Sequence, residues 1–366
     1  MRSLLSFFTF ALLFPASVLS QKDTLTIIGV GDIMMGTDYP SRVYLPPGDN
    51  CQPLMSEVYD ILQDSDLTFG NFEGTFAGDK GKPKACKDTT MCFVFRMPQH
   101  YVKCLEDAGF DMLSIANNHA NDFGPGGREE TQRILEGSGF AYAGALGIPH
   151  TILVKEGVRY GLIAFAPNLG CYSIKDPEQA ILLVEEVRAN CDILIVSVHG
   201  GAEGKDHQHM TRESEIYLGY DRGNIYEFAH MVVDAGADVV FGHGPHVTRA
   251  AEIYKDRFII YSLGNFCTYR RFNLRGPNGI APIIKLRVTA DGRFASGQVI
   301  PVYQPGQGGV RPDPQKRAIY KLRDLTTMDF PEVPLEIDDI GMMTYSPAPL
   351  NQDTIRQDIP LHDTIR

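Results

Sequence analysis

The stretch DVVFGHGPH at residues 238–246 contains the unit from which much of the chain is built. It begins with Asp238 and continues with a short run of β-branched and aromatic residues that is typical of a buried strand. His243 and His246 follow directly, and the Gly and Pro around them fix the backbone so that both imidazoles can point into one site. The stretch therefore predicts a strand that carries two possible metal ligands at its carboxyl end.

The same unit of an Asp, a short strand and a polar cluster occurs three more times, each after a segment with helical spacing. The copies begin at Asp66, Asp111 and Asp192, and their polar clusters are Asn71 with Glu73, Asn118 with His119, and His199 with Glu203. A further strand, over 24–30, leads to Asp32. Helices that alternate with strands indicate βαβ units, in which ligands bind outside the carboxyl ends of the parallel strands. We therefore expect the clusters to converge in space.

Three pairs of segments predict antiparallel hairpins, because each pair flanks a short turn. They cover 151–155 with 158–166, 251–254 with 258–263, and 280–289 with 294–303. We expect the hairpins to form a second, largely antiparallel sheet that packs on the first. The predicted fold class is α/β, with two packed sheets and helices outside them.

The two ends of the chain differ in character from its middle. Residues 1–20 contain Arg2, an apolar run and small residues before Ser20, which is typical of an export signal. We therefore expect an exported protein, periplasmic or extracellular, with no transmembrane span in its mature form, because no later stretch reaches about 20 apolar residues. Residues 21–305 are predicted to form one domain. Residues 306–366 are predicted to be a Pro- and Gly-rich extension that is partly disordered, with one helix at 319–325.

Composition restricts the partners and the redox state. The formal net charge is −11, and Lys and Arg are not clustered, so nucleic acid is an unsuitable partner. The seven cysteines include Cys86 and Cys92, which flank a short polar loop and are the best candidates for a disulfide. An odd number of cysteines leaves at least one thiol free or intermolecular.

The strand-end inventory of carboxylate, amide and imidazole groups, without cysteine, suits Mn, Fe or Zn. Two such ions could hold a phosphoryl-type group and activate a water, and a nearby His could protonate the leaving oxygen. Arg270 and Arg271 follow the strand that ends at 261–266 and could meet an anionic substrate, although a surface role is equally compatible with the sequence.

Six motifs, in this order within residues 24–302, resemble the CapA-type capsule synthesis proteins, also called poly-γ-glutamate biosynthesis proteins. They are GDIMMG at 31–36, NFEG at 71–74, ANNH at 116–119, HGGAE at 199–203, GHGPH at 242–246 and YSLGNF at 261–266. That family is similar in turn to the calcineurin-like metallophosphoesterases. The resemblance implies their four-layer α/β/β/α sandwich of two packed mixed sheets, and a site for two divalent ions.

The resemblance also implies roles for individual residues. It makes Asp32 and His246 ligands of a first ion, and Asn118, His199 and His243 ligands of a second, with Asn71 or Glu73 as the bridge. It makes His119 the general acid, beside a catalytic Asn118. We expect Glu203, Asn265 and Arg270 to contact the substrate.

One position departs from the phosphoesterase pattern, because Met34 stands where those enzymes place a His. The first ion is therefore expected to be weakly held, absent, or completed by Glu203. The leading hypothesis is an exported hydrolase that uses a metal-activated water to cleave a phosphoester or an anionic cell-envelope polymer. The alternative is a non-catalytic accessory protein that binds an anionic capsule polymer or its synthase, and in either case the capsule-synthesis machinery is a candidate partner.

Overall fold

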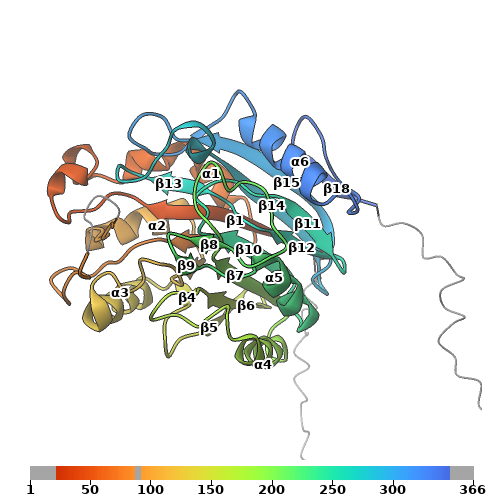
Figure 1. The fold of residues 1–366 in the computed structure, drawn as a ribbon, viewed down its shortest axis with the longest axis horizontal. Coiled ribbons are helices and arrows are strands. Elements are labelled where there is room, and N and C mark those ends of the chain that lie inside the picture. The colour runs from red at the N-terminus through yellow and green to blue at the C-terminus, as the bar shows by residue number, and fades with distance from the viewer. Residues whose placement is uncertain (1–21, 87–91, 347–366) are drawn as a thin grey trace, which may run out of the picture.

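A computed structural model describes residues 22–86 and 92–346, in which two β-sheets pack face to face and helices cover their outer faces (Figure 1). The larger sheet has the order β17-β18-β15-β14-β1-β2-β3-β4, with β13 beside β1 and β16 beside β15. Its strands are β1 (Thr24–Met34), β2 (Leu67–Phe72), β3 (Met112–Ser114), β4 (Ala141–Ala143), β13 (Asn265–Thr268), β14 (Ile280–Thr289), β15 (Phe294–Tyr303), β16 (Arg311–Pro312), β17 (Leu335–Ile337) and β18 (Met342–Tyr345).

The smaller sheet has the order β11-β12-β10-β7-β6-β5. Its strands are β5 (His150–Lys155), β6 (Val158–Phe165), β7 (Ile193–His199), β10 (Val239–His243), β11 (Ala251–Tyr254) and β12 (Arg257–Ile260). Strands β6, β7, β10 and β12 run parallel, as do β1 to β4 in the larger sheet. Each sheet therefore has a parallel centre, as the repeated units predict.

The three predicted hairpins are present as β5–β6, β11–β12 and β14–β15, but the prediction that they form a sheet of their own is wrong. The first two extend the smaller sheet on either side of its parallel centre, and the third extends the larger sheet beside β1. Hairpin signals are local in sequence, so they fix the pairing within a hairpin and not the strand that the hairpin joins.

Three layers of apolar contact confirm the four-layer α/β/β/α arrangement. The layer between the sheets includes Ile27 and Phe69 from the larger sheet and Ile195 and Phe241 from the smaller one. The rings of Phe69 and Phe241 stack with centroids 5.2 Å apart. A Cβ at Gly29 would lie 2.4 Å from the Phe241 ring, so this glycine permits the close approach of the two sheets.

The outer layers are made by helices. Helices α1 (Tyr59–Gln63), α2 (Val102–Ala108) and α3 (Gly124–Gly137) cover the larger sheet, and α4 (Pro177–Arg188) and α5 (Ile225–Asp234) cover the smaller one. Helix α5 shows the physical basis of this packing, because its buried residues include Ile225, Phe228, Val232 and Val233, which share one helix face. Within the described residues, no helix combines the length and the apolar character needed to cross a membrane.

Residues 306–346, the described part of the predicted extension, form regular elements that pack on the rest of the fold. They contain α6 (Arg317–Asp329), which includes the predicted helix at 319–325, and β17 and β18, which join the edge of the larger sheet through β15. Ile319 and Leu322 of α6 pack into the layer between the sheets. The density of Pro and Gly concealed this apolar helix face. The predicted signal segment at 1–20 and the end of the predicted extension, 347–366, lie outside the described residues.

The Asp that opens each repeated unit has a structural role at the amino ends of the strands. In all four units its carboxylate accepts a backbone N–H from the neighbouring parallel strand. The pairs are Asp66 with Thr26 at 2.7 Å, Asp111 with Thr68 at 2.9 Å, Asp192 with Arg159 at 2.8 Å and Asp238 with Leu194 at 2.8 Å. Each carboxylate also pairs with a Lys or Arg side chain. These Asp residues therefore connect adjacent parallel strands at their amino ends.

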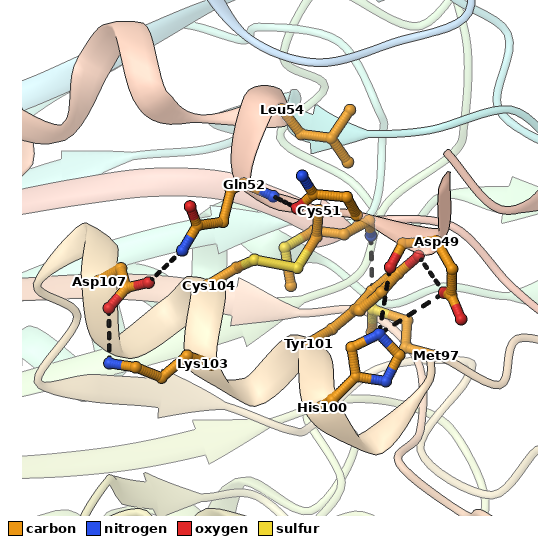
Figure 2. The surroundings of a disulfide bond; sticks show 12 residues. Asp49, Cys51, Gln52, Leu54, Met97, His100, Tyr101, Lys103, Cys104 and Asp107 are labelled. Carbon is orange, nitrogen blue, oxygen red and sulfur yellow. Dashed lines mark hydrogen bonds and ion pairs between the residues drawn. A yellow bond between two sulfur atoms is a disulfide. The ribbon is translucent and has the colours of Figure 1, made fainter. Parts of the chain in front are cut away.

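Two disulfides fasten the loops of the larger sheet's outer layer. Cys86 pairs with Cys92, as predicted, and Cys51 pairs with Cys104 of α2, which the sequence does not indicate. Figure 2 shows the second bond, flanked by hydrogen bonds from Gln52 and Lys103 to Asp107. The other three cysteines, Cys171, Cys191 and Cys267, are buried and unpaired.

Candidate metal centre

The strand registers bring the predicted site residues together at the carboxyl ends of the parallel strands. Asp32 of β1 is paired with Asn71 of β2 on one side and with Asn265 of β13 on the other. In the smaller sheet His199 of β7 is paired with His243 of β10. Because the two sheets pack face to face, these ends form one buried cluster, which confirms the predicted convergence.

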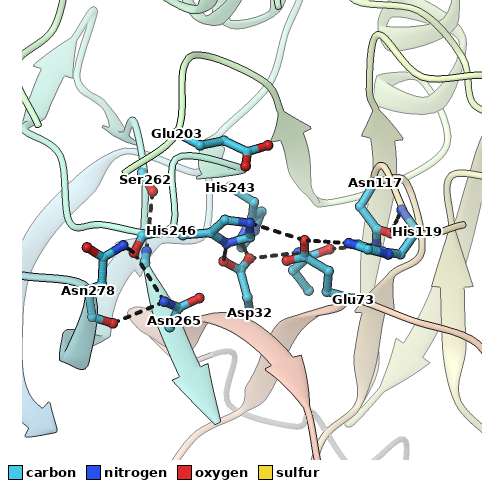
Figure 3. A network of polar contacts seen from close by, with 12 residues as sticks. Asp32, Glu73, Asn117, His119, Glu203, His243, His246, Ser262, Asn265 and Asn278 are labelled. Atoms are coloured by element: carbon cyan, nitrogen blue, oxygen red, sulfur yellow. Dashed lines mark hydrogen bonds and ion pairs between the residues drawn. The ribbon is translucent and has the colours of Figure 1, made fainter. Parts of the chain in front are cut away.

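Asp32, Glu73 and His246 form the centre of the cluster (Figure 3). One candidate ligand atom from each of them lies within 4.8 Å of the others. His246 Nδ1 is 2.8 Å from Asp32 Oδ2, and His246 Nε2 is 3.5 Å from Glu73 Oε1. The backbone of His246 is left-handed, with φ of 57°, and this uncommon conformation is found where surrounding structure fixes it.

Charges within the cluster are strongly coupled. Burial opposes ionisation of Asp32, but the neighbouring imidazoles of His243 and His246 hold the pKa of its carboxyl well below the usual range. Burial disfavours a charged His246, yet Glu73 and Asp32 raise its pKa to about 10. Burial and the charge of Asp32 raise the pKa of Glu73 well above its usual value. The cluster thus stabilises a positive charge between its two carboxyl groups.

Several buried polar atoms of the cluster have no hydrogen-bond partner in the described part of the chain. They are both ring nitrogens of His199, both ring nitrogens of His243, Oε1 of Glu73 and Oδ1 of Asn118. Burial of an unpaired polar group is unfavourable, and buried polar atoms in proteins almost always have a partner. Burial also lowers the pKa of His199 well below its usual value, which keeps the ring neutral as a metal ligand must be. This donor set fits divalent ions of the Mn, Fe or Zn type.

His119 forms a separate pair with Asp122 at the side of the cluster. Its Nδ1 is 2.7 Å from Asp122 Oδ2, and its Nε2 faces Glu73 Oε1 at 4.0 Å. The ring also stacks on Phe95, with centroids 4.1 Å apart. Burial lowers the pKa of His119, although Asp122 opposes that shift. The carboxylate therefore fixes the ring so that Nε2 is the nitrogen directed toward the cluster.

Asn71 and Asn117 hold other members of the site in position. The Nδ2 of Asn71 donates to Asp32 Oδ1 at 2.8 Å and lies 3.4 Å from Glu73 Oε2. Its Oδ1 accepts from Asn117 Nδ2 at 3.2 Å, so the amide links the carboxylates and its oxygen is already engaged. Asn117 also accepts the backbone N–H of His119 and so shapes the turn. Asn71 thus has the contacts of a supporting residue more than those of the predicted ligand.

A cavity of about 800 Å³ opens above the cluster, and Asn118, His119 and His246 line it. Of the residues predicted to contact substrate, Glu203 and Asn265 line this cavity. Glu203 pairs with Arg222 at 3.0 Å, and Asn265 Nδ2 donates to the backbone oxygens of His246 and Asn278. Arg270 lines a smaller neighbouring cavity and not the main one, whereas the adjacent Arg271 lines both.

Some residues of the site were not identified from the sequence. Arg222, Phe95 and Lys84 line the cavity but lie in segments without a motif. Met34 is fully buried in the apolar layer that faces α2, so the position where phosphoesterases place a His contributes no ligand in this chain.

Comparisons with known proteins give a family match over most of the chain. Residues 26–270 match the family described as bacterial capsule synthesis protein PGA_cap. The capsule biosynthesis protein CapA of Bacillus anthracis is 30% identical over 267 residues, which are 67% of this chain and 60% of the relative. The PGA biosynthesis protein CapA of Bacillus subtilis (strain 168) is 31% identical over 262 residues, which are 67% of this chain and 64% of the relative. The chain thus spans less than two thirds of the length of either relative.

Among solved structures, the purple acid phosphatase PPD1 from yellow lupin seeds is similar to 81% of this chain, with a TM-score of 0.43 and 11% sequence identity. The similarity covers 55% of the phosphatase chain.

Proposed function

Because the chain belongs to the bacterial capsule synthesis protein PGA_cap family, we propose that it is an exported, metal-dependent hydrolase of a phosphoester or an anionic cell-envelope polymer. The names of the Bacillus relatives connect those proteins with capsule and PGA biosynthesis. We extend that connection to this chain, with the capsule-synthesis machinery as its candidate partner.

The observation that carries the proposal is the pair of fully buried, unpartnered imidazoles of His199 and His243 beside the carboxylate of Asp32. The ring nitrogens of both residues lack hydrogen-bond partners in the described residues, and leaving buried polar groups unpaired is unfavourable unless they bind something. A divalent cation accounts for both rings at once, whereas within the described residues His243 has only a 3.6 Å contact with Asp32 and His199 has none.

The residues that would hold the ions are Asp32, Glu73, Asn118, His199, His243 and His246. Ions bound there would supply Lewis acidity to an oxyanion of the substrate. The chain's own contribution is clearest at His119. Asp122 fixes the ring from Nδ1, so a proton can pass between Nε2 and the leaving oxygen of a group seated over Glu73. Asn71 keeps the two carboxylates in register by hydrogen bonding to both.

The test joins metal content to turnover. We expect the purified chain, supplied with manganese, to bind up to two equivalents and to hydrolyse a generic phosphodiester or a γ-glutamyl polymer. His119→Gln should retain the metal and lose turnover, whereas the exposed His100→Gln serves as the matched control and should retain both. Two bound equivalents without turnover of either substrate would refute the hydrolase assignment.

A second function is favoured by Met34. Its side chain is buried in the core, so the first ion lacks one ligand of the phosphoesterase pattern, and His246 already pairs with both carboxylates. A chain of this kind could be a non-catalytic accessory protein that binds an anionic capsule polymer or its synthase. Polymer binding without turnover, at one equivalent of metal or none, would identify that role.

Export is supported by the two disulfides, since such bonds persist mainly in oxidising compartments. We expect the mature protein outside the cytoplasm to begin near residue 21. Amino-terminal sequencing of the extracytoplasmic and cytoplasmic fractions tests this expectation. An uncleaved chain confined to the cytoplasmic fraction would contradict export.

A further inference from the structure

Four Lys and Arg side chains line the main cavity, and three of them are engaged by carboxylates. Lys84 lies 2.5 Å from Asp122, Lys175 lies 3.9 Å from Asp221, and Arg222 lies 3.0 Å from Glu203. The fourth is Arg271, which makes neither an ion pair nor a hydrogen bond to any residue of the described chain, and whose Nε is buried without a partner. Its hydrogen-bonding capacity is therefore available to a ligand.

The guanidinium of Arg271 is nevertheless held in place. Its central carbon lies over the ring of Tyr44 at 4.7 Å from the centroid and over the ring of Phe93 at 4.6 Å. Contacts between a guanidinium and aromatic rings fix its plane without consuming its N–H donors. The backbone adds to this constraint, because Arg270 and Arg271 are consecutive non-glycine residues in the left-handed region, with φ of 51° and 60°. Such strain concentrates at binding sites.

Aromatic rings connect Arg271 to the metal centre. Phe95 stacks on His119 and also on Phe272, with centroids 4.1 Å and 5.3 Å apart. Phe272, the residue after Arg271, packs edge-on against the His246 ring at 5.2 Å. Arg271 and the proposed proton carrier therefore line the same cavity, and a series of aromatic contacts links Phe272, the neighbour of Arg271, to His119.

We propose that Arg271 binds an oxyanion of the substrate other than the reacting group, and so selects substrates with a second negative charge. The planar fork of a guanidinium pairs with two oxygens of one group, so the ligand chemistry is a carboxylate or a phosphate. The kinetic part of this proposal rests on the proposed hydrolase function, whereas the binding part is independent of turnover.

The binding test uses the full chain with metal removed by a chelator. Isothermal calorimetry with a triglutamate peptide and with inorganic pyrophosphate separates the carboxylate source from the phosphate source. We expect at least one probe to bind, and Arg271→Gln to weaken that probe's binding by tenfold or more. Arg271→Lys, which keeps the charge and loses the fork, should bind with intermediate affinity.

Arg270→Gln is the matched control, because Arg270 shares the left-handed backbone but faces the neighbouring cavity and donates to Gln307. Its affinity for either probe should equal that of the wild type. Binding that is equal in Arg271→Gln and Arg270→Gln, or no binding of either probe by the wild type, would overturn the proposal.

The kinetic test compares two aryl phosphates that differ only by a carboxylate on the aryl group. For Arg271→Gln we expect the KM of the carboxylated ester to rise tenfold or more, the KM of the ester without the carboxylate to change less than twofold, and kcat to stay constant. Equal changes in both KM values contradict selection by Arg271. If the wild type turns over neither ester, the hydrolase proposal fails by itself and the calorimetry alone decides the role of Arg271.

Discussion

The two ends of the parallel strands use the same residue types in opposite ways. At the amino ends Asp66, Asp111, Asp192 and Asp238 each accept a backbone N–H and pair with a cation, so their charges are satisfied by the fold itself. At the carboxyl ends Asp32 and Glu73 lie among His199 and His243, whose ring nitrogens have no hydrogen-bond partner in the described chain. The side chains at the amino ends thus hold neighbouring strands together, whereas those at the carboxyl ends include polar groups without hydrogen-bond partners that a ligand could bind.

This contrast separates stability from function along each strand. Substitutions at the amino ends should change the free energy of unfolding and leave binding intact, whereas substitutions at the carboxyl ends should do the reverse.

The largest effect is expected for His119→Gln. Loss of a positioned proton carrier reduces kcat by roughly 10²- to 10⁴-fold. The fold should lose little stability, because Asp122 keeps the backbone N–H of Phe95 and the ammonium of Lys84 as partners. Steady-state kinetics and a thermal melt measure the two quantities. A variant that melts much earlier than the wild type would place His119 with the structural residues instead.

At the opposite end of the strands, Asp238→Ala should cost about 3 kcal/mol of unfolding free energy. The carboxylate is buried, accepts the Leu194 N–H, and pairs with Arg188 and Arg257, so its removal leaves that N–H without its acceptor and both guanidinium groups without their buried counter-charge. Urea unfolding measures the loss, with Asp64→Ala as the control, because Asp64 pairs with Lys285 on the surface. That exposed pair should contribute less than about 1 kcal/mol. Metal affinity that falls along with the stability of Asp238→Ala would contradict the separation of the two ends.

The third effect has the opposite sign. His199→Leu replaces an unpartnered, fully buried imidazole by an apolar side chain, so the metal-free protein should gain roughly 1 to 2 kcal/mol. Manganese should raise the Tm of the wild type, and His199→Leu should lose that upward shift. Denaturant unfolding with a chelator, and thermal melts with and without manganese, test both halves. A destabilised His199→Leu would mean that the ring is satisfied within the fold.

The contrast also explains what could be predicted from the sequence. The four units can be recognised because each begins with an Asp and ends with ligand-type residues. The Asp lies at the amino end of its strand and the ligand-type residues at the carboxyl end, and the corresponding ends of the parallel strands lie side by side. Pairing of His199 with His243 follows from the parallel register, which strand order and hydrophobic pattern already imply. What the opening Asp does was not predicted, because a hydrogen bond to the neighbouring strand's backbone leaves no signature in the sequence of that strand.

Other parts of the site depend on contacts that sequence spacing does not encode. Arg270 and Arg271 are identical in type and adjacent, yet only Arg271 lines the main cavity, and nothing in the spacing of the sequence distinguishes the two. The strand-end position of Asn71 predicts a metal ligand, whereas in the structure its side-chain amide donates to both Asp32 and Glu73. The same limit applies to the hairpins. Local signals predict the pairing within each hairpin correctly, but they do not determine which sheet the hairpin joins.

The smallest expected effect concerns the charge of Asp192, which is partly exposed and pairs with Arg159 at 2.7 Å. That ion pair holds the pKa of Asp192 below its usual value. A carboxyl whose pKa is lower in the folded state stabilises the fold above its unfolded pKa of about 3.9, and this contribution is lost as the pH falls through the folded pKa.

Asp192→Asn keeps an acceptor for the Arg159 N–H and removes only the charge. The wild type should therefore exceed Asp192→Asn by less than about 1 kcal/mol at pH 7, and the two should converge as the pH falls below 4. Urea titrations at several pH values measure the difference, which added salt should reduce because the pair is solvated. If the difference in unfolding free energy grows toward low pH, or does not change with salt, the charge of the amino-end Asp residues is not what stabilises the fold. These residues would then act only as hydrogen-bond acceptors.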